Sequence, residues 1–238
     1  MTIINRTHRF IYIHVPKTGG TSLKLYLDGF SRSGDICLTN GTHPAGTHST
    51  NATLKKHSSA KDVCKYLGED EFARFFRFSI VRNPFERVNS IFHFLKFKFR
   101  GWPRSEIMNR FESPEDLVVS GFFRRPGPGG IFEPQTRWLT LNGGLAVDYL
   151  VRLETLDADM TKIFHRLSLG DRPLPIERKN ASRVLEDDET YSNISPAAVE
   201  AIRSRYAADF TTLGYSPDPP CRHTPEREIG CSGPPIID

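Results

Sequence analysis

A strand that runs into a glycine-containing loop and then a helix, over residues 11–27, constrains the fold of this chain more than any other stretch. Its β-prone start is stopped by Pro16, a loop with Lys17 follows, and an apolar helical pattern begins at Leu23. Backbone N–H groups at a helix N-terminus lack helical partners, and the helix dipole is positive there. The stretch therefore predicts an α/β fold whose first turn binds an anion such as phosphate.

The loop can bind an anion through a positive charge, backbone N–H groups and hydroxyl groups. The residues that supply them are Lys17, Thr18, Gly19, Gly20, Thr21 and Ser22. It is not a Walker A loop, because that pattern places its lysine after the glycines and here the lysine comes first. A kinase-type P-loop is therefore disfavoured. An ordinary strand-to-helix turn, whose glycines serve only tight geometry, is the plainer alternative.

A second strand–turn–helix pattern covers residues 76–94. Arg82 stands where the strand ends, which is where ligands bind in open α/β sheets, and Ser90 lies further along the helix. Arg82 can fork onto a phosphate and Ser90 can donate to the same group, whereas the alternative pairs Arg82 with Glu86. Two phosphate-suited turns in one chain indicate a ligand with phosphate at both ends.

The segments VPKTGGTSL, at 15–23, and FSIVRNPFERVNSIF, at 78–92, together resemble the PAPS-dependent sulfotransferases, in the branch that acts on carbohydrates. PAPS is 3′-phosphoadenosine 5′-phosphosulfate, the sulfate donor of that family. Weaker matches follow in the family's order, at 134–139, 152–160, 178–183 and 205–215. The first two segments are specific as a pair, and the later ones only support them.

The resemblance implies an α/β fold with a mostly parallel central sheet, helices on both faces and a P-loop-like phosphate-binding turn. It implies that the first loop holds the 5′-phosphosulfate, that Arg82 and Ser90 hold the 3′-phosphate, and that Asn180 and Ser182 close over the nucleotide. Lys17 is then expected to stabilise the oxygen that leaves sulfur, because donors aimed at developing charge are the largest catalytic contribution in many enzymes. The reaction that this family performs needs no metal.

Sulfuryl transfer also needs a base for the acceptor hydroxyl, and histidine suits that task near neutral pH. The resemblance points to His48, in a segment between the two phosphate motifs where the family has an acceptor-side histidine. His43 is the reserve. A carboxylate base, Glu133 or Glu154, remains open.

Length and charge agree with this interpretation. A chain of 238 residues can bury a sizeable core, and we expect a sulfotransferase domain over 1–215 and a proline-rich tail over 216–238. With 32 basic and 28 acidic residues, the net charge of +4 suits anionic ligands but is too small to indicate nucleic acid. The expected partner is a hydroxyl-bearing acceptor, implied by the resemblance to be a glycan.

No apolar stretch has the length of a membrane span, and no signal peptide is visible, which favours a cytoplasmic or otherwise soluble protein. Glycosylation sequons at Asn5, Asn40, Asn51, Asn180 and Asn193 are interpreted as mostly incidental. The four cysteines lack metal-binding spacing, so no metal is expected, and Cys221 and Cys231 form either a disulfide or two thiols.

Two rival functions belong to other classes. A nucleotide or small-molecule kinase would need Mg²⁺ and an acidic residue after a hydrophobic strand, for which no persuasive candidate is found. A non-catalytic nucleotide- or glycan-binding protein would lack a base, whereas this chain has eight histidines. Elsewhere the patterns predict a surface loop over 31–58, a helix over 59–75 broken near Gly68, and a helix from Ser195 to about residue 210.

Overall fold

The computed structural model describes residues 2–20, 23, 26–27, 29–37, 54–98, 105–170 and 194–220. By their internal contacts the residues group into two compact units. The first comprises Met1–Val81, Gln135–Asn180 and Ser232–Asp238, and the second comprises Arg82–Pro134 and Ala181–Cys231.

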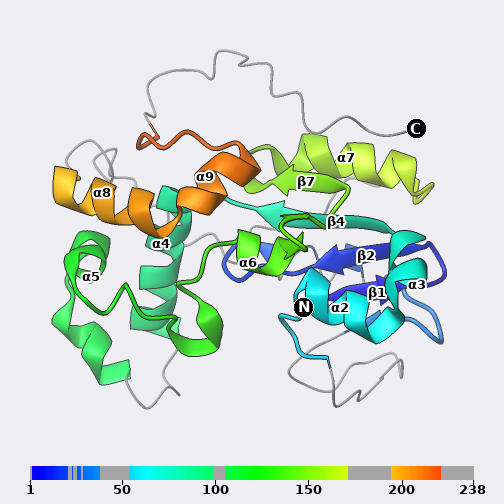
Figure 1. Cartoon of the computed structure of the whole chain (residues 1–238), viewed down its shortest axis with the longest axis horizontal. Coiled ribbons are helices and arrows are strands. Elements are labelled where there is room, and N and C mark those ends of the chain that lie inside the picture. Colours follow the sequence, from blue (N-terminus) through cyan, green and yellow to red (C-terminus); the bar gives the residue numbers. More distant parts are fainter. Residues whose placement is uncertain are drawn as a thin grey trace. The chain divides into compact units, whose positions relative to one another are not determined.

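The first unit is built on a five-stranded sheet in the order β3-β1-β2-β4-β7 (Figure 1). Its strands are β1 Ile3–Asn5, β2 Phe10–Ile13, β3 Ile36–Cys37, β4 Phe76–Val81 and β7 Tyr149–Arg152. β2, β4 and β7 run parallel, whereas β1 is antiparallel to both β2 and β3. The expected α/β class is confirmed, but the sheet is mixed rather than mostly parallel.

The mixed sheet has a local cause. The connection 6–9 between β1 and β2 is short, and a short connection can join only antiparallel neighbours, because a parallel pair needs a crossover of about a dozen residues. β1 was not predicted from the sequence, and β3 lies within the segment 31–58 that was predicted to be a surface loop. Both strands are short and fully buried, so they lack the alternation that marks a half-exposed strand.

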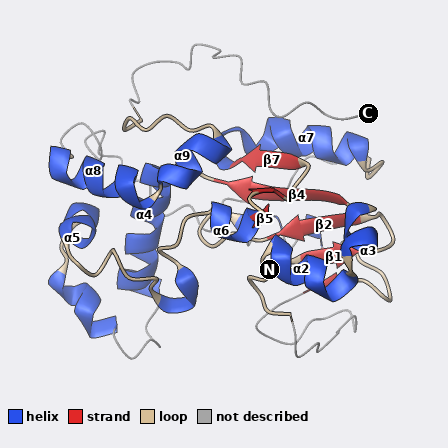
Figure 2. Ribbon diagram, viewed as in Figure 1, coloured by secondary structure: helices blue, strands red, loops and turns tan. Residues whose placement is uncertain are grey.

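Helices and a small hairpin complete the first unit (Figure 2). These elements are α2 Ala60–Leu67, α3 Glu69–Ala73, α6 Thr136–Leu139, β5 Thr140–Leu141, β6 Gly144–Leu145, the 3₁₀ turn η4 Leu153–Thr155 and α7 Leu156–Arg166. The break predicted near Gly68 is confirmed, since Gly68 has φ 87° and separates α2 from α3. Ser59 starts α2 through a reciprocal pair of hydrogen bonds with Asp62, the capping box.

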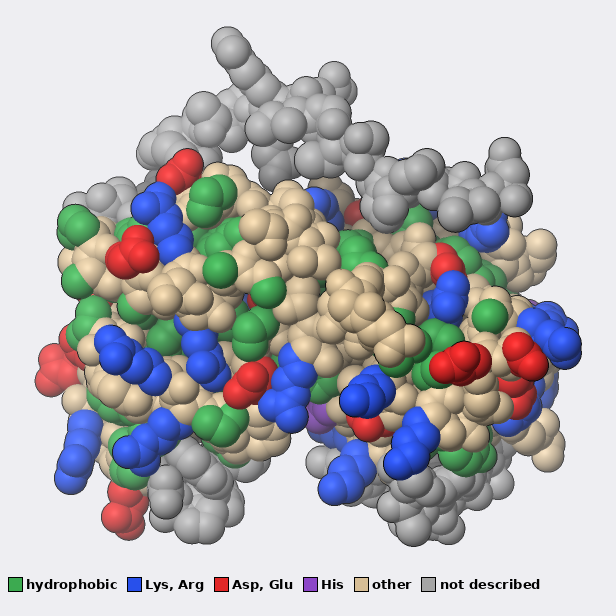
Figure 3. All heavy atoms as spheres, viewed as in Figure 1, with side chains coloured by type: hydrophobic (Ala, Val, Ile, Leu, Met, Phe, Trp, Pro, Cys, Tyr) green, Lys and Arg blue, Asp and Glu red, His purple; other side chains and the backbone are tan. Residues whose placement is uncertain are grey.

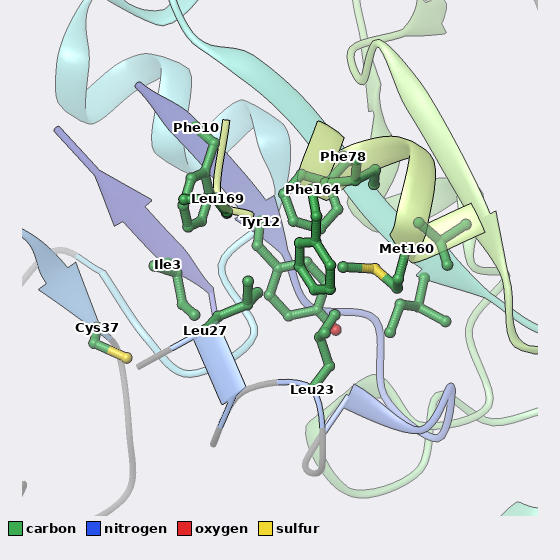
Figure 4. Close-up of a cluster of buried hydrophobic side chains, with 13 residues drawn as sticks. Ile3, Phe10, Tyr12, Leu23, Leu27, Cys37, Phe78, Met160, Phe164 and Leu169 are labelled. Atoms are coloured by element: carbon green, nitrogen blue, oxygen red, sulfur yellow. The ribbon is translucent and has the colours of Figure 1, made fainter. Parts of the chain in front are cut away.

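One face of the sheet carries a cluster of buried hydrophobic side chains (Figure 4). Tyr12 lies at its middle, among Leu23 and Leu27 from the segment after the first loop and Met160 and Phe164 from α7. Alternate strand residues point to opposite faces, and the intervening residues of β2 and β4 are also fully buried: Ile11, Ile13, Ser79 and Val81. Both faces of the sheet are therefore covered.

A buried hydroxyl ties β4 to the end of β2. Ser79 Oγ donates to the carbonyl oxygen of Ile13 at 2.8 Å, and Ser79 is 0% exposed. We expect Ser79→Ala to lower the free energy of unfolding by about 0.5–1.5 kcal/mol, the usual net contribution of such a bond, in denaturant titrations of the full chain.

Thr161→Ala is the matched control for Ser79→Ala, because its hydroxyl donates to the Asp157 carbonyl at 2.8 Å on the exposed side of α7. Surface substitutions of this kind change stability by less than about 0.5 kcal/mol. Equal losses in the two variants would contradict a specific role for the Ser79 bond.

The second unit is helical among the residues that the structure describes. It contains α4 Pro84–His93, the π-helix η1 Phe94–Lys98, the 3₁₀ turns η2 Ser105–Arg110 and η3 Pro128–Gly130, α5 Pro114–Val119, α8 Pro196–Arg205 and α9 Ala207–Leu213. The helix predicted from Ser195 begins there, but it is two helices. The backbone of Tyr206, at φ −112° and ψ 24°, leaves the helical region between α8 and α9.

Two arginines fix the loop that precedes residue 134. Arg87, on α4, is 0% exposed and donates to the carbonyls of Glu133 and Ile131, both at 3.0 Å. Arg205, at the end of α8, donates to the carbonyl of Phe132 and pairs with the Glu133 carboxylate at 3.2 Å. Both guanidinium groups therefore hold backbone that has no regular secondary structure of its own.

Basic and acidic side chains are interspersed over the face that Figure 3 shows, in keeping with the small net charge. In the part of the chain that the structure describes, no helix is both long enough and apolar enough to span a bilayer.

Candidate functional site

The candidate site begins at the loop that follows β2. The loop comprises residues 14–19, and helical backbone begins at Gly20. Lys17 has φ 70° and Gly19 has φ 79°, so both lie in the left-handed region. Glycine adopts that region freely, but for a lysine it is uncommon and costs about 1–3 kcal/mol when the surroundings impose it. The expected order of strand, loop and helix is present, with its strain concentrated at the lysine.

The side chain of Thr18 closes this loop from inside. Thr18 is 0% exposed, and its hydroxyl donates to the Val15 carbonyl at 3.0 Å. The hydroxyl proton of Thr18 therefore stabilises the turn in this structure. Lys17, by contrast, is half-buried and Gly19 is exposed.

The turn that follows β7 packs against the loop through Leu153. A Cβ atom on Gly19 would lie 2.6 Å from Leu153 Cδ1, so only glycine fits without displacing Leu153. Asp159 anchors that turn, because its carboxylate accepts from the backbone of Arg152 at 3.1 Å and from Thr155 Oγ1 at 2.9 Å. Burial by itself raises the pKa of Asp159, but these hydrogen bonds, with those from the side chains of Tyr149 and Lys162, outweigh it and lower the pKa.

Gly20 lies against two buried polar rings. A Cβ atom there would come within 2.2 Å of His14 Cδ2 and 2.5 Å of the Tyr12 hydroxyl oxygen. The Tyr12 hydroxyl and His14 Nδ1 are buried, and neither has a hydrogen-bond partner among the residues that the structure describes. Burial raises the pKa of Tyr12 and lowers that of His14 well below its usual value, so both groups are neutral near pH 7.

A second histidine covers the first. The rings of His14 and His57 are stacked, with centroids 4.6 Å apart and planes 24° apart. His57 Nδ1 lies 3.3 Å from the carbonyl oxygen of His14. No local sequence pattern distinguishes His57, because its partner lies 43 residues away in the chain.

The second motif starts from the strand beside β2. β2 and β4 are parallel neighbours with Ile13 opposite Ser79, so both strands end at the same edge of the sheet. Asn83 begins α4 by accepting a hydrogen bond from the backbone N–H of Phe85 at 2.9 Å, with Pro84 in the first turn. The strand, turn and helix predicted over 76–94 are thus confirmed.

Arg82 and Ser90 belong to the second unit. Arg82 Nη2 donates to Glu86 Oε2 at 3.2 Å, the ion pair that the sequence analysis weighed as the alternative to phosphate binding. Ser90 is 6% exposed on α4. The ion pair and a phosphate contact are compatible, because a guanidinium carries five N–H donors.

Several predicted site residues lie outside the described residues: Thr21, Ser22, His48, Asn180 and Ser182. His43, the reserve base, also lies outside them. Of the two carboxylates left open as bases, Glu133 is engaged by Arg205 and Glu154 is exposed in the turn after β7. Among the described residues no group of three or more histidine, cysteine or acidic side chains is placed to hold a metal ion.

Comparison with known proteins defines the class. The model of a sulfotransferase family matches residues 1–216, so this chain belongs to that family. Among curated proteins it is 28% identical to carbohydrate sulfotransferase 10 of Xenopus laevis over 252 residues, which is 89% of this chain and 66% of the relative. It is 27% identical to the Rattus norvegicus protein of the same name and 28% identical to the human one, each over 87% of this chain and 65% of the relative.

The chain thus spans slightly less than two thirds of the length of these relatives. No solved structure matches the chain. The family confirms the resemblance carried by the two phosphate motifs.

Proposed function

We propose that this protein transfers a sulfuryl group from PAPS to a hydroxyl group of a carbohydrate. The observation that carries the proposal is the loop after β2, where a lysine is held in the left-handed region at the carboxyl end of a parallel strand, in a chain of the sulfotransferase family. Observed backbone strain of this kind clusters at ligand-binding sites. The carbohydrate acceptor is inferred from the names of the relatives.

Each motif has a proposed role. The loop 16–22 binds the 5′-phosphosulfate, with the ammonium of Lys17 beside the oxygen that bridges phosphorus and sulfur. Arg82 and Ser90 bind the 3′-phosphate, while Asn180 and Ser182 close over the nucleotide. Residues 1–215 act as one sulfotransferase domain, followed by the tail 216–238.

The proposed reaction is an in-line displacement. The acceptor oxygen forms a bond to sulfur while the bond between sulfur and the bridging oxygen breaks, and its electron pair stays on that oxygen. Lys17 stabilises the negative charge that develops there, and a histidine base takes the hydroxyl proton. The sequence candidate for that base is His48. The products are the sulfated acceptor and adenosine 3′,5′-bisphosphate.

Isothermal titration of the full chain tests the proposal. We expect adenosine 3′,5′-bisphosphate to bind at least about tenfold more tightly than ATP–Mg²⁺, because a contact to the 3′-phosphate contributes about 1.5–3 kcal/mol. Since no metal is needed, EDTA should leave this affinity unchanged. Preference for ATP–Mg²⁺, or loss of nucleotide binding in EDTA, would instead support a kinase with a variant P-loop.

A further inference from the structure

The turn that follows β7 forms one wall of the phosphate loop. In the described sheet β7 is an edge strand and β4 separates it from β2, so no strand pairing connects it with the strand that leads into the loop (Figure 1). The contact is made instead by the side chain of Leu153, the first residue of η4. A Cβ atom on Gly19 would have Cδ1, Cδ2 and Cγ of Leu153 as its nearest neighbours, at 2.6, 3.5 and 3.7 Å. The position of Leu153 therefore limits how the loop backbone can move on this side.

One carboxylate holds the backbone on both sides of Leu153. Asp159 Oδ2 accepts a hydrogen bond from the backbone N–H of Arg152 at 3.1 Å and one from the Thr155 hydroxyl at 2.9 Å. Arg152 directly precedes Leu153, and Thr155 is the last residue of η4. Asp159 itself is 8% exposed. Both ends of the turn are therefore bound to the same oxygen atom of a buried carboxylate.

The other oxygen of this carboxylate has different partners. Asp159 Oδ1 accepts from the Tyr149 hydroxyl at 3.0 Å and from Lys162 Nζ at 3.2 Å. The side chain of Lys162 is 65% exposed on α7. Lys162 therefore shares the carboxylate but has no bond to the turn that carries Leu153, which makes it a matched control.

The phosphate loop needs support from outside because its conformation is strained. Lys17 has φ 70°, and a non-glycine residue stays in that region only when the surrounding structure imposes it. The hydroxyl of Thr18, bonded to the Val15 carbonyl, is one constraint within the loop. The Leu153 side chain against Gly19 is a second, from outside. A loop that loses a constraint spends less time in its binding conformation, and its apparent affinity falls by that fraction.

We propose that Asp159 is a positioning residue for sulfuryl transfer, which acts through Leu153 to hold the phosphate loop in the conformation that receives the 5′-phosphosulfate. The inference rests on the proposed function, because it concerns the same loop. Asp159 contacts neither the nucleotide nor the acceptor in this scheme. Its effect is confined to one end of the cofactor, since the residues proposed to bind the 3′-phosphate belong to the second unit and Asp159 belongs to the first.

Calorimetric titration with two nucleotides, directly or in competition, tests this selectivity. Adenosine 3′,5′-bisphosphate has the 5′-phosphate that the loop is proposed to bind, and 3′-AMP lacks it. We expect Asp159→Ala to weaken binding of the bisphosphate about 5–100-fold, the range expected when the strain of one left-handed residue is no longer supported. Binding of 3′-AMP should change less than about twofold, because this ligand has no group for the loop. A merely structural role would leave both affinities of the folded protein unchanged or lower both by the same factor.

Conservative variants identify the route of the effect. Asp159→Asn keeps an oxygen that can accept both bonds from the turn, so its affinity for the bisphosphate should stay within about threefold of wild type. Leu153→Ala should show the same selective loss as Asp159→Ala, whereas Leu153→Met keeps a long apolar side chain against Gly19 and should not. Lys162→Ala breaks only an exposed ion pair, and we expect both affinities to stay within about twofold of wild type.

Three results would overturn the assignment. The first is an equal loss for both nucleotides in Asp159→Ala, and the second is bisphosphate affinity near that of wild type in Leu153→Ala. The third is a loss in Lys162→Ala as large as that in Asp159→Ala, because the carboxylate would then not act through the turn. If thermal unfolding shows that Asp159→Ala does not fold, Leu153→Ala and Leu153→Met decide by the same comparison. Failure of the wild-type chain to bind adenosine 3′,5′-bisphosphate instead refutes the proposed function, and this inference with it.

Discussion

Lys17→Ala should lower turnover at saturating PAPS about 10²–10³-fold while changing the affinity for adenosine 3′,5′-bisphosphate by less than about fivefold. The ammonium is expected to act on charge that exists only as the sulfur–oxygen bond breaks, whereas the loop backbone binds the ground state in both proteins. Alanine at φ 70° meets the same backbone strain as lysine, so the variant removes the charge without relieving the loop. Steady-state rates and calorimetric affinities give the two numbers.

Two further variants make the Lys17 result specific. Lys17→Arg keeps a positive charge and should retain more activity than Lys17→Ala. Lys61→Ala removes an exposed lysine of α2 in the same unit and should have no effect. If Lys17→Ala lost nucleotide affinity but kept its turnover at saturation, Lys17 would be only a binding residue.

Arg82→Ala should weaken binding of adenosine 3′,5′-bisphosphate more than tenfold, yet hardly change binding of 5′-AMP. A charge-assisted contact contributes about 1.5–3 kcal/mol, and only the first ligand has the 3′-phosphate that Arg82 is proposed to hold. Isothermal titration with both nucleotides measures the difference. Equal losses for both ligands would remove Arg82 from the 3′-phosphate site.

Glu86→Gln is the matched control for Arg82, because it breaks the same 3.2 Å ion pair and leaves the guanidinium in place. A purely structural ion pair predicts similar losses of stability in both variants and no change in nucleotide preference. Phosphate binding predicts that Glu86→Gln binds adenosine 3′,5′-bisphosphate at least as well as wild type, since an opposing carboxylate has been neutralised. Thermal unfolding of each variant checks the structural part.

The stability of the first unit is expected to depend on pH through His14 and His57, the two stacked histidines beside the loop. His14 and His57 both have folded-state pKa values below that of an unfolded histidine, so the unfolded chain binds more protons between about pH 3 and 6.5. Their contribution to stability is complete above about pH 6.5 and declines as the pH falls through that range. The low pKa of His57, which keeps the ring neutral, therefore depends on the intact fold.

The sequence by itself determined the local parts of this protein. Pro16 and the loop after it, the break at Asn83-Pro84 and the turn at Gly68 are each set by residues within a few positions of one another, and all were found where predicted. The same local signals carried the family resemblance. The helix start at Ser59 was predictable for the same reason, since a cap bonds to backbone only three residues away.

Only the tertiary structure decided the mixed sheet and the surroundings of the loop. β1 is specified by pairing with β2 and β3 rather than by its own pattern, and Gly20 is required by the rings of His14 and Tyr12 rather than by a turn. His57 gains its orientation from a carbonyl 43 residues earlier in the chain. Contacts over such separations leave no periodic or spacing signal in the sequence, because they depend on how the sheet brings β2 and the segment before α2 together.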